Sequence, residues 1–357
     1  MASWSQAVEE VAAAVAADPG VCMLLGATDT GKTTLARILA NALLERGRRV
    51  AVVDGDVGQS DVGPPATVGL TVLDRPCPDL SGAPLDAAYF VGSNSPEPLL
   101  LETVTGVRLM VDRALARGCD AVVVDTTGLV HGPQGRALKR AKLELVRPRH
   151  AVLLERRREM EGLLRQCAAL PCRAWRLEVA PEVRRKTPDE RRRAREARFA
   201  DHLAAGRRVT ARLGEFGFLR SMLGAGHPVP AAELSSLARG IDCDVVYAER
   251  LPEALYLVTR GPRDRLSLEQ VQRRSGAPRL IDVDEAAFRD LLCGIHGRDG
   301  EFLGLAVLED LDFRAGAAAL FTAVEGAPPS SWQWLAVGVL RVGRDGRELG
   351  RISPGEV

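Results

Sequence analysis

The fold is decided by residues 21–34, which read Val21-Cys-Met-Leu-Leu-Gly26-Ala27-Thr28-Asp29-Thr30-Gly31-Lys32-Thr33-Thr34. An apolar run is followed by the pattern G-x-x-x-x-G-K-T and then by a helical pattern, which is the order that a phosphate-binding loop requires. The glycines let the backbone approach phosphate oxygens, and the N–H groups at the start of the helix bind negative charge. Residues 26–34 therefore predict a nucleoside-triphosphate site.

Two residues of this loop have specific expected roles. Lys32 would reach the β and γ phosphates, and the Thr33 hydroxyl would be a ligand of Mg²⁺. Lysine is rare here, because only four of the 48 basic residues are lysines, at positions 32, 139, 142 and 186. The alternative is a glycine turn that happens to precede a helix.

The loop lies within an alternation of strands and helices. Short apolar strands are expected at 21–25, 50–54, 121–125 and 151–155, with helices at 32–46, 97–117 and 136–146. Strands that are apolar throughout and alternate with helices predict an α/β fold, a doubly wound and mostly parallel sheet covered on both faces. Ligands of such sheets bind beyond the carboxyl ends of the strands. The segments 26–33, 54–60 and 125–128 should therefore gather there.

Two of these segments carry candidate site residues. Asp54 and Asp56 close the second strand, where one carboxylate can hold Mg²⁺ through water and the other can accept a proton from an attacking hydroxyl. We therefore count Thr33, Asp54 and Asp56 as candidate metal ligands; the alternative is a pair of turn aspartates that cap the strand. Asp125-Thr-Thr-Gly128 has the D-x-x-G pattern of a GTPase switch. No lysine stands in an N/T-K-x-D motif, which disfavours that interpretation.

A basic region follows the fourth strand. Residues 156–198 contain 13 arginines and one lysine against seven acidic residues. Thr187, Pro188 and Glu190 are suited to the N-cap, N1 and N3 positions of a helix. Arg191, Arg195 and Arg198 would share one face of it. The alternative is a solvated, charged helix with no role in the chemistry.

Composition and pattern together predict two domains. We expect an N-terminal helix at 1–20, a P-loop domain at 21–205 with an arginine-rich lid at about 184–200, a linker at 206–230 and a smaller, mainly antiparallel β domain at 231–357. Strands of the last part are expected at 245–248, 254–259, 279–283, 291–294, 301–308, 319–324 and 334–342. Asp-Gly turns at 297–300 and 343–346 would connect hairpins.

Global composition excludes several classes of protein. A net charge of +1 excludes a uniformly basic nucleic-acid coat. No apolar run approaches the roughly 20 residues that span a bilayer, so no membrane association is expected. The odd number of cysteines, seven, and the lack of an export signal indicate a reducing cytoplasm.

The motifs resemble the polynucleotide 5′-hydroxyl kinases, the family that contains the RNA kinase of the eukaryotic pre-mRNA cleavage factor, in its shorter archaeal or bacterial form. The resemblance extends from residue 21 to the C-terminus. Asp54-Gly-Asp-Val-Gly-Gln59 is its most specific part, and the other matching segments are 26–35, 60–70, 89–93, 125–130, 186–195 and 339–348.

The resemblance implies a role for each matching residue. Lys32 and Thr33 would bind triphosphate and Mg²⁺, Asp56 would activate the 5′-hydroxyl, and Gln59 would position the 5′-terminal nucleotide. Thr126, Thr127 and Gly128 match a nucleic-acid clasp. The arginines after Thr187 match a lid over the γ-phosphate, with Arg191 and Arg195 favoured as the catalytic pair.

Two departures from the eukaryotic members are visible. Leu129 stands where they have a tryptophan after the clasp glycine, so recognition would depend more on salt-sensitive arginine contacts with phosphates. Only about twenty residues precede the first strand, so their N-terminal β domain is not expected.

The sequence thus predicts a Mg²⁺-dependent kinase that transfers the γ-phosphate of ATP, or of GTP or another NTP, to the 5′-hydroxyl end of RNA or DNA. Two alternatives stay open. One is an inactive ATP-binding scaffold of an RNA-processing complex, and the other is a P-loop NTPase switch. No protein partner is indicated.

Overall fold

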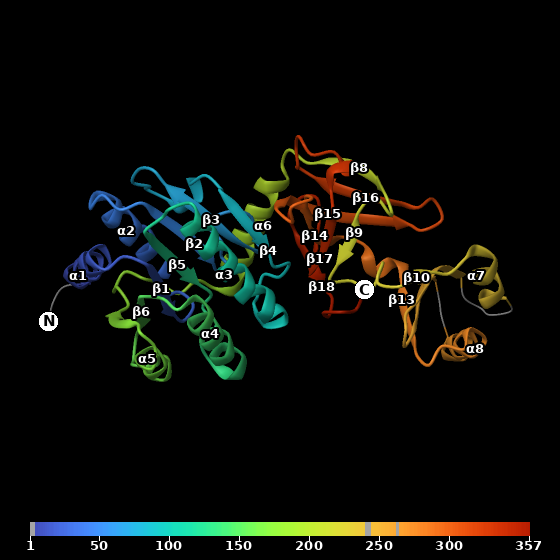
Figure 1. Cartoon of the computed structure of the whole chain (residues 1–357), viewed down its shortest axis with the longest axis horizontal. Coiled ribbons are helices and arrows are strands. Elements are labelled where there is room, and N and C mark those ends of the chain that lie inside the picture. The colour runs from blue at the N-terminus through green and yellow to red at the C-terminus, as the bar shows by residue number, and fades with distance from the viewer. Residues whose placement is uncertain (1–3, 240–243, 262–263) are drawn as a thin grey trace. The chain divides into compact units, whose positions relative to one another are not determined.

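The chain divides into two compact units, Met1–Arg198 and Phe199–Val357 (Figure 1). The computed structural model describes residues 4–239, 244–261 and 264–357. The first three residues of the expected N-terminal helix and Cys243 lie outside these ranges. The six other cysteines are free thiols. Within the described residues, none of the helices combines the length and apolar character that crossing a bilayer demands.

A seven-stranded sheet forms the centre of the first unit, with the order β4-β3-β2-β5-β1-β6-β7. The strands β2, β5, β1, β6 and β7 are parallel, and β3 and β4 extend the β2 side antiparallel. Their bounds are β1 Val21–Gly26, β2 Val50–Gly55, β3 Thr67–Leu73, β4 Ala87–Phe90, β5 Ala121–Thr126, β6 His150–Glu155 and β7 Arg173–Glu178. All residues of β1, β2, β5 and β6 are buried, as expected for a sheet covered on both faces.

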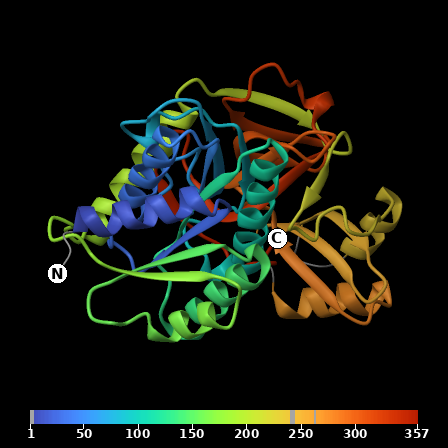
Figure 2. The ribbon, with the colours of Figure 1, turned by 60° about the vertical axis from the view of Figure 1, so that its left-hand side comes forward.

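Helices cover both faces of this sheet and can be followed by colour in Figure 2. On one face α1 and α2 pack over alternate strand residues such as Val52 and Val123. On the other, Val107 of α3 approaches Gly55, which has the opposite parity along β2, and α3 packs against α4. The bounds are α1 Trp4–Ala17, α2 Lys32–Glu45, α3 Leu100–Ala116, α4 Gly132–Val146, α5 Glu161–Ala168 and α6 Pro188–Leu203, with short 3-10 helices at Leu80–Gly82 and Glu97–Leu99.

The second unit contains two sheets. A seven-stranded sheet has the order β18-β17-β14-β15-β16-β8, with β9 paired to β17, and a four-stranded sheet has the order β10-β11-β12-β13. The larger sheet consists of β8 Arg207–Arg212, β9 Gly217–Leu219, β14 Leu291–His296, β15 Phe302–Asp312, β16 Ala317–Thr322, β17 Trp334–Val342 and β18 Glu348–Arg351. The smaller one consists of β10 His227–Pro228, β11 Asp244–Arg250, β12 Leu255–Arg260 and β13 Leu280–Asp284.

Helices α7 Ala231–Ala238 and α8 Arg265–Ser275 pack on the smaller sheet through Leu237 and Val271. Short 3-10 helices lie at Glu285–Phe288 and Pro329–Ser331. All seven strands expected from the sequence are present, and both Asp-Gly turns join antiparallel neighbours. The prediction of a mainly antiparallel second part is confirmed; the parallel pairs β12 with β13 and β9 with β17 are exceptions.

The segment 206–230 differs from the linker expected there. It contains β8, β9 and β10, and β8 pairs with β16 over six residues. Its sequence Arg-Arg-Val-Thr-Ala-Arg has only one buried residue, Ala211, because β8 is an edge strand. An edge strand needs little apolar surface, so the hydrophobic pattern did not indicate it. The contact boundary also falls earlier than expected, inside α6.

Candidate active site

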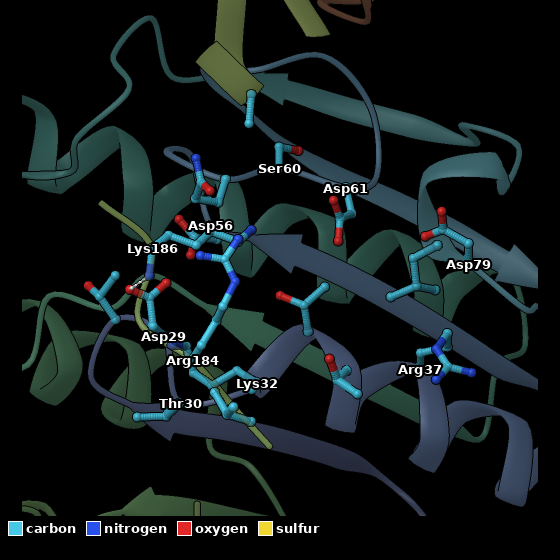
Figure 3. A pocket seen from close by; sticks show the side chains of 18 of the residues that line it. Asp29, Thr30, Lys32, Arg37, Asp56, Ser60, Asp61, Asp79, Arg184 and Lys186 are labelled. Carbon is cyan, nitrogen blue, oxygen red and sulfur yellow. Dashed lines mark hydrogen bonds between the residues drawn. The ribbon is translucent and has the colours of Figure 1, made fainter. Parts of the chain in front are cut away.

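The loops that follow β1, β2 and β5 meet at the carboxyl edge of the sheet, because these three strands are neighbours in it. The register pairs Asp54 with Asp125 and Gly55 with Thr126. A cavity of about 600 Å³ opens beside them, and its walls come from the phosphate loop, the loop after β2, and the segment that includes the start of α6. Figure 3 shows Asp56, Asp61 and Asp79 along one side of this cavity and Thr30, Lys32 and Arg37 along the other.

The phosphate loop has the backbone geometry that its glycines permit. Gly31 precedes α2 with a φ of 82°, in the left-handed region. A Cβ on Gly26 would lie 2.6 Å from the Thr30 hydroxyl oxygen, so the loop closes tightly on the end of β1. The Lys32 ammonium group donates a hydrogen bond to the Ala27 carbonyl over 2.8 Å, and the Thr30 hydroxyl donates to the same oxygen. These contacts hold Lys32, which is buried, inside the loop.

Thr33 is paired with an aspartate that sequence reasoning did not assign to the metal. Its hydroxyl donates to a carboxylate oxygen of Asp125 over 2.5 Å. Burial raises the pKa of Asp125 to about 6, against the lowering effect of the Lys32 charge. The sequence signal for Asp125 was an apolar strand that ends in aspartate. This strand lies next to the strand that leads into the phosphate loop, and P-loop NTPases hold Mg²⁺ with a threonine and an aspartate placed in this way.

Asp54 differs from the expected metal ligand because its carboxylate is turned into its own loop. It accepts hydrogen bonds from the backbone N–H groups of Asp56, Asp61 and Val62, at 3.0, 2.6 and 3.0 Å. Burial, together with the charge of Asp125, raises the pKa of Asp54. Asp54 is 2% exposed and is not among the residues that line the cavity. Its observed contacts shape the loop that presents Asp56.

Asp56 and Gln59 do line the cavity. The Gly58 N–H donates to the Asp56 carboxylate over 3.1 Å, which fixes the side chain against its loop. The Gln59 amide donates to the backbone carbonyl of Arg191 over 3.3 Å. Gln59 therefore connects the loop after β2 with helix α6.

Two of the three expected clasp residues, Thr126 and Thr127, are buried and lie outside the cavity lining. The Thr126 hydroxyl donates to the Leu24 carbonyl over 2.7 Å, and Thr126 and Thr127 are 0% and 2% exposed. Neither lines the cavity. Gly128 lies directly against the phosphate loop, since a Cβ there would be 2.5 Å from the backbone nitrogen of Thr28. The segment thus supports the nucleotide loop in this structure.

Helix α6 begins with the expected capping box. The Thr187 hydroxyl accepts from the Glu190 N–H at 3.2 Å, and the Glu190 carboxylate accepts from the Thr187 N–H at 2.7 Å. Arg191 forms an ion pair with Asp29 at 3.1 Å and is not in the cavity wall. Arg195 is in the wall.

Arg184, Lys186 and Arg198, from the same segment as Arg195, also line the cavity, as does Arg37 of α2. The sequence placed Arg198 on the same helix face as Arg191 and Arg195, but it assigned no role to Arg184 or Lys186, for which the density of basic residues in this region was the available signal. Arg198 also donates to the Asp61 carbonyl over 2.6 Å, which fixes α6 to the loop after β2. A wall with several cations is suited to the negative charge of a triphosphate.

The oxygen donors at the cavity fit Mg²⁺. This ion prefers oxygen ligands and is commonly bound by one or two carboxylates together with substrate phosphates. Thr33 and Asp125 present oxygens 2.5 Å apart next to the phosphate loop, and Asp56 lies in the same cavity. Of these, Thr33 and Asp125 are the residues that would hold the ion.

Comparison with known proteins identifies relatives along nearly the whole chain. The family described as mRNA cleavage and polyadenylation factor CLP1 P-loop matches residues 26–204. The polyribonucleotide 5′-hydroxyl-kinase of Pyrococcus horikoshii is 30% identical over 341 residues, covering 94% of this chain and 89% of that protein. The protein of the same description from Thermococcus kodakarensis is 31% identical, with 95% and 93% covered.

A solved structure shares the fold. A chain of the Clp1p–Pcf11p complex superimposes with a TM-score of 0.61 at 12% identity, and the match covers 94% of this chain and 78% of that chain. The resemblance seen in the sequence motifs is confirmed by these matches. The chain belongs to the CLP1 P-loop family, alongside archaeal polyribonucleotide 5′-hydroxyl-kinases.

Proposed function

We propose that this protein is a polynucleotide 5′-hydroxyl kinase that transfers the γ-phosphate of ATP to the 5′-hydroxyl end of RNA. The observation that carries the proposal is one cavity lined by the phosphate loop, Asp56 and lid cations including Arg195. The description of the archaeal relatives as polyribonucleotide 5′-hydroxyl-kinases supports the acceptor class. DNA ends are the alternative acceptor, and other NTPs are the alternative phosphate donors.

Each residue at the cavity has a separate role in the proposed reaction. Lys32 and the N–H groups at the start of α2 bind the phosphates, because a helix N-terminus attracts anions. Mg²⁺, held by Thr33 and Asp125, would neutralise charge on the β and γ phosphates. Asp56 accepts the proton of the 5′-hydroxyl as that oxygen attacks the γ-phosphorus, whose bond to the β–γ bridging oxygen breaks so that ADP leaves. Arg195 stabilises the negative charge of the transferring group from the lid side.

The deciding experiment uses γ-labelled ATP with matched 5′-hydroxyl RNA and DNA oligonucleotides. Asp56→Asn should lower the transfer rate by about 10²–10⁴-fold, the usual worth of a positioned general base. ATP binding, measured separately by titration, should change little because Lys32 and Thr33 are untouched. The control is Asp112→Asn, on the outer face of α3, where the carboxylate only pairs with Arg108.

Each result has a definite meaning. Label on RNA that depends on Asp56 supports the proposal, and label on DNA alone would replace the acceptor. Intact ATP binding without label on either oligonucleotide would contradict it and favour an ATP-binding scaffold. Running the same reactions with GTP, CTP and UTP identifies the preferred donor.

A further inference from the structure

All four lysines of the chain lie near the carboxyl ends of the central strands, where the candidate active site is. Lys32 belongs to the phosphate loop and Lys186 lines the cavity. The other two, Lys139 and Lys142, are on α4 and approach the strand ends from the opposite face of the sheet. Every other basic residue of the chain except histidine is arginine, so lysine occurs only where the candidate chemistry is.

The two α4 lysines are fully buried, at 0% exposure. Lys139 is well bonded, because its ammonium group donates to the Thr126 hydroxyl at 2.8 Å and to the Thr127 carbonyl at 2.5 Å. The Lys142 nitrogen has no hydrogen-bond partner among the described residues. It lies directly behind Gly55, 3.6 Å from the position that a Cβ on Gly55 would take. Gly55 stands between Asp54 and Asp56.

A buried cation without hydrogen bonds is unstable unless opposite charge lies near it. Burial lowers the pKa of Lys142 to about 8, and the carboxylates that oppose this shift are, in order of size, Asp56, Asp125 and Asp54. The carboxylate of Asp54 already accepts hydrogen bonds from loop N–H groups. The carboxylate of Asp125 accepts one from the Thr33 hydroxyl. Asp56, which accepts one hydrogen bond from the Gly58 N–H, is therefore the principal counter-charge of Lys142.

We propose that Lys142 is a positioning residue for Asp56. The buried ammonium group of Lys142 lies behind Gly55 and supplies the positive charge that keeps the Asp56 carboxylate in place. A guanidinium group would not serve here, since its five donors need partners that this site does not offer. The part that concerns catalysis rests on the proposed function. The electrostatic part concerns folding alone and can be tested without any transfer reaction.

The test is a double-mutant cycle with Lys142→Met and Asp56→Asn, which separates a pairwise interaction from the effect of each change. Lys142→Met should lower the urea midpoint of unfolding when Asp56 is present. In the Asp56→Asn protein the same change should leave the midpoint unchanged or raise it, because the lysine has lost its counter-charge. Arg140→Met removes a cation from the exposed face of the same helix and should give equal, small shifts in both backgrounds.

Kinetics provide the second readout. Lys142→Met should lower kcat by about tenfold to a hundredfold, part of the worth of a general base, while KM for ATP stays within about twofold because Lys32 and Thr33 are unaffected. Equal shifts of the urea midpoint in the two Asp56 backgrounds would overturn the inference whether or not the enzyme transfers phosphate. If Lys142→Met does not fold alone but folds together with Asp56→Asn, the inference is supported. Failure of both to fold would overturn it.

Discussion

Gly128 lies so close to the phosphate loop that no side chain fits at this position. Any side chain here would occupy the space of Thr28, because a Cβ would lie 2.2 Å from its hydroxyl oxygen and 2.6 Å from its Cα. The backbone of the phosphate loop would have to move. The glycine that resembles a nucleic-acid clasp thus has a second, purely steric reason to be glycine.

Gly128→Ala should therefore weaken nucleotide binding. Overpacking of this kind costs about 1–3 kcal/mol, which corresponds to a rise of about fivefold to over a hundredfold in the KM or Kd for ATP if the loop absorbs the whole cost. Isothermal titration with ATP measures it. Gly162→Ala is the matched control, because no atom lies within 4 Å of the new Cβ on α5 and a helix gains stability from alanine. Unchanged ATP affinity in Gly128→Ala would contradict the steric argument.

For Asp54 and Asp125 the sequence could predict the position of the residue but not the direction of its side chain. Both aspartates could be placed at the carboxyl ends of neighbouring strands from the apolar runs that precede them. The direction of each side chain could not, because it depends on which loop closes over it. Asp54 accepts hydrogen bonds from N–H groups seven and eight residues later, whereas Asp125 meets Thr33, which is 92 residues away along the chain.

At the scale of elements, helix α6 places two of its arginines in different surroundings. Arg191 is engaged with Asp29 and with the Lys186 carbonyl, and Arg195, one turn later, is in the cavity wall. The spacing of four could predict that both share a face, and the capping box could predict where the helix begins. The choice between them could not be predicted, since it depends on the position of Asp29 after folding.

Arg195→Ala should slow transfer far more than Arg193→Ala, an exposed change on the same helix. An arginine that stabilises a transferring phosphoryl group can be worth about 10³–10⁵ in rate. Nucleotide affinity should change much less than the rate, and single-turnover kinetics together with ATP titration separate the two. Near-normal turnover in Arg195→Ala would remove this arginine from the mechanism.

Strand prediction succeeded or failed according to burial. The buried strands β1, β2, β5 and β6 appear at their expected positions because parallel strands between helix layers must be apolar throughout. The edge strands β7 and β8 carry several charged residues and lack that signal. The antiparallel strands β3 and β4 lie beyond β2, in a region where the sequence resembled a binding motif and was not interpreted as strand.

At the scale of the whole molecule, stability should depend on pH through His296 in the second unit. Its side chain is 9% exposed, with Nδ1 bonded to the Gly300 carbonyl at 3.1 Å and Nε2 without a partner among the described residues. Burial lowers the pKa of His296 below its ordinary value of 6.5. Below pH 6.5 the unfolded chain therefore binds a proton that the folded chain does not.

The free energy of unfolding should fall as the pH falls from 6.5 toward the folded pKa of His296. The largest slope from one group is about 1.4 kcal/mol per pH unit. Urea unfolding between pH 5 and pH 7.5 measures it, and the His296→Gln protein should lack this part of the slope. Identical pH profiles for the two proteins would show that His296 is protonated equally in both states.

The distribution of lysines has a practical consequence. Lys139 and Lys142 are fully buried and Lys32 is 5% exposed, whereas Lys186 is exposed at the cavity wall, next to Asp29 of the phosphate loop. A reagent that modifies side-chain amines would find one accessible lysine on the folded protein. A fluorophore attached there would report nucleotide entry from inside the cavity, without the introduction of a cysteine.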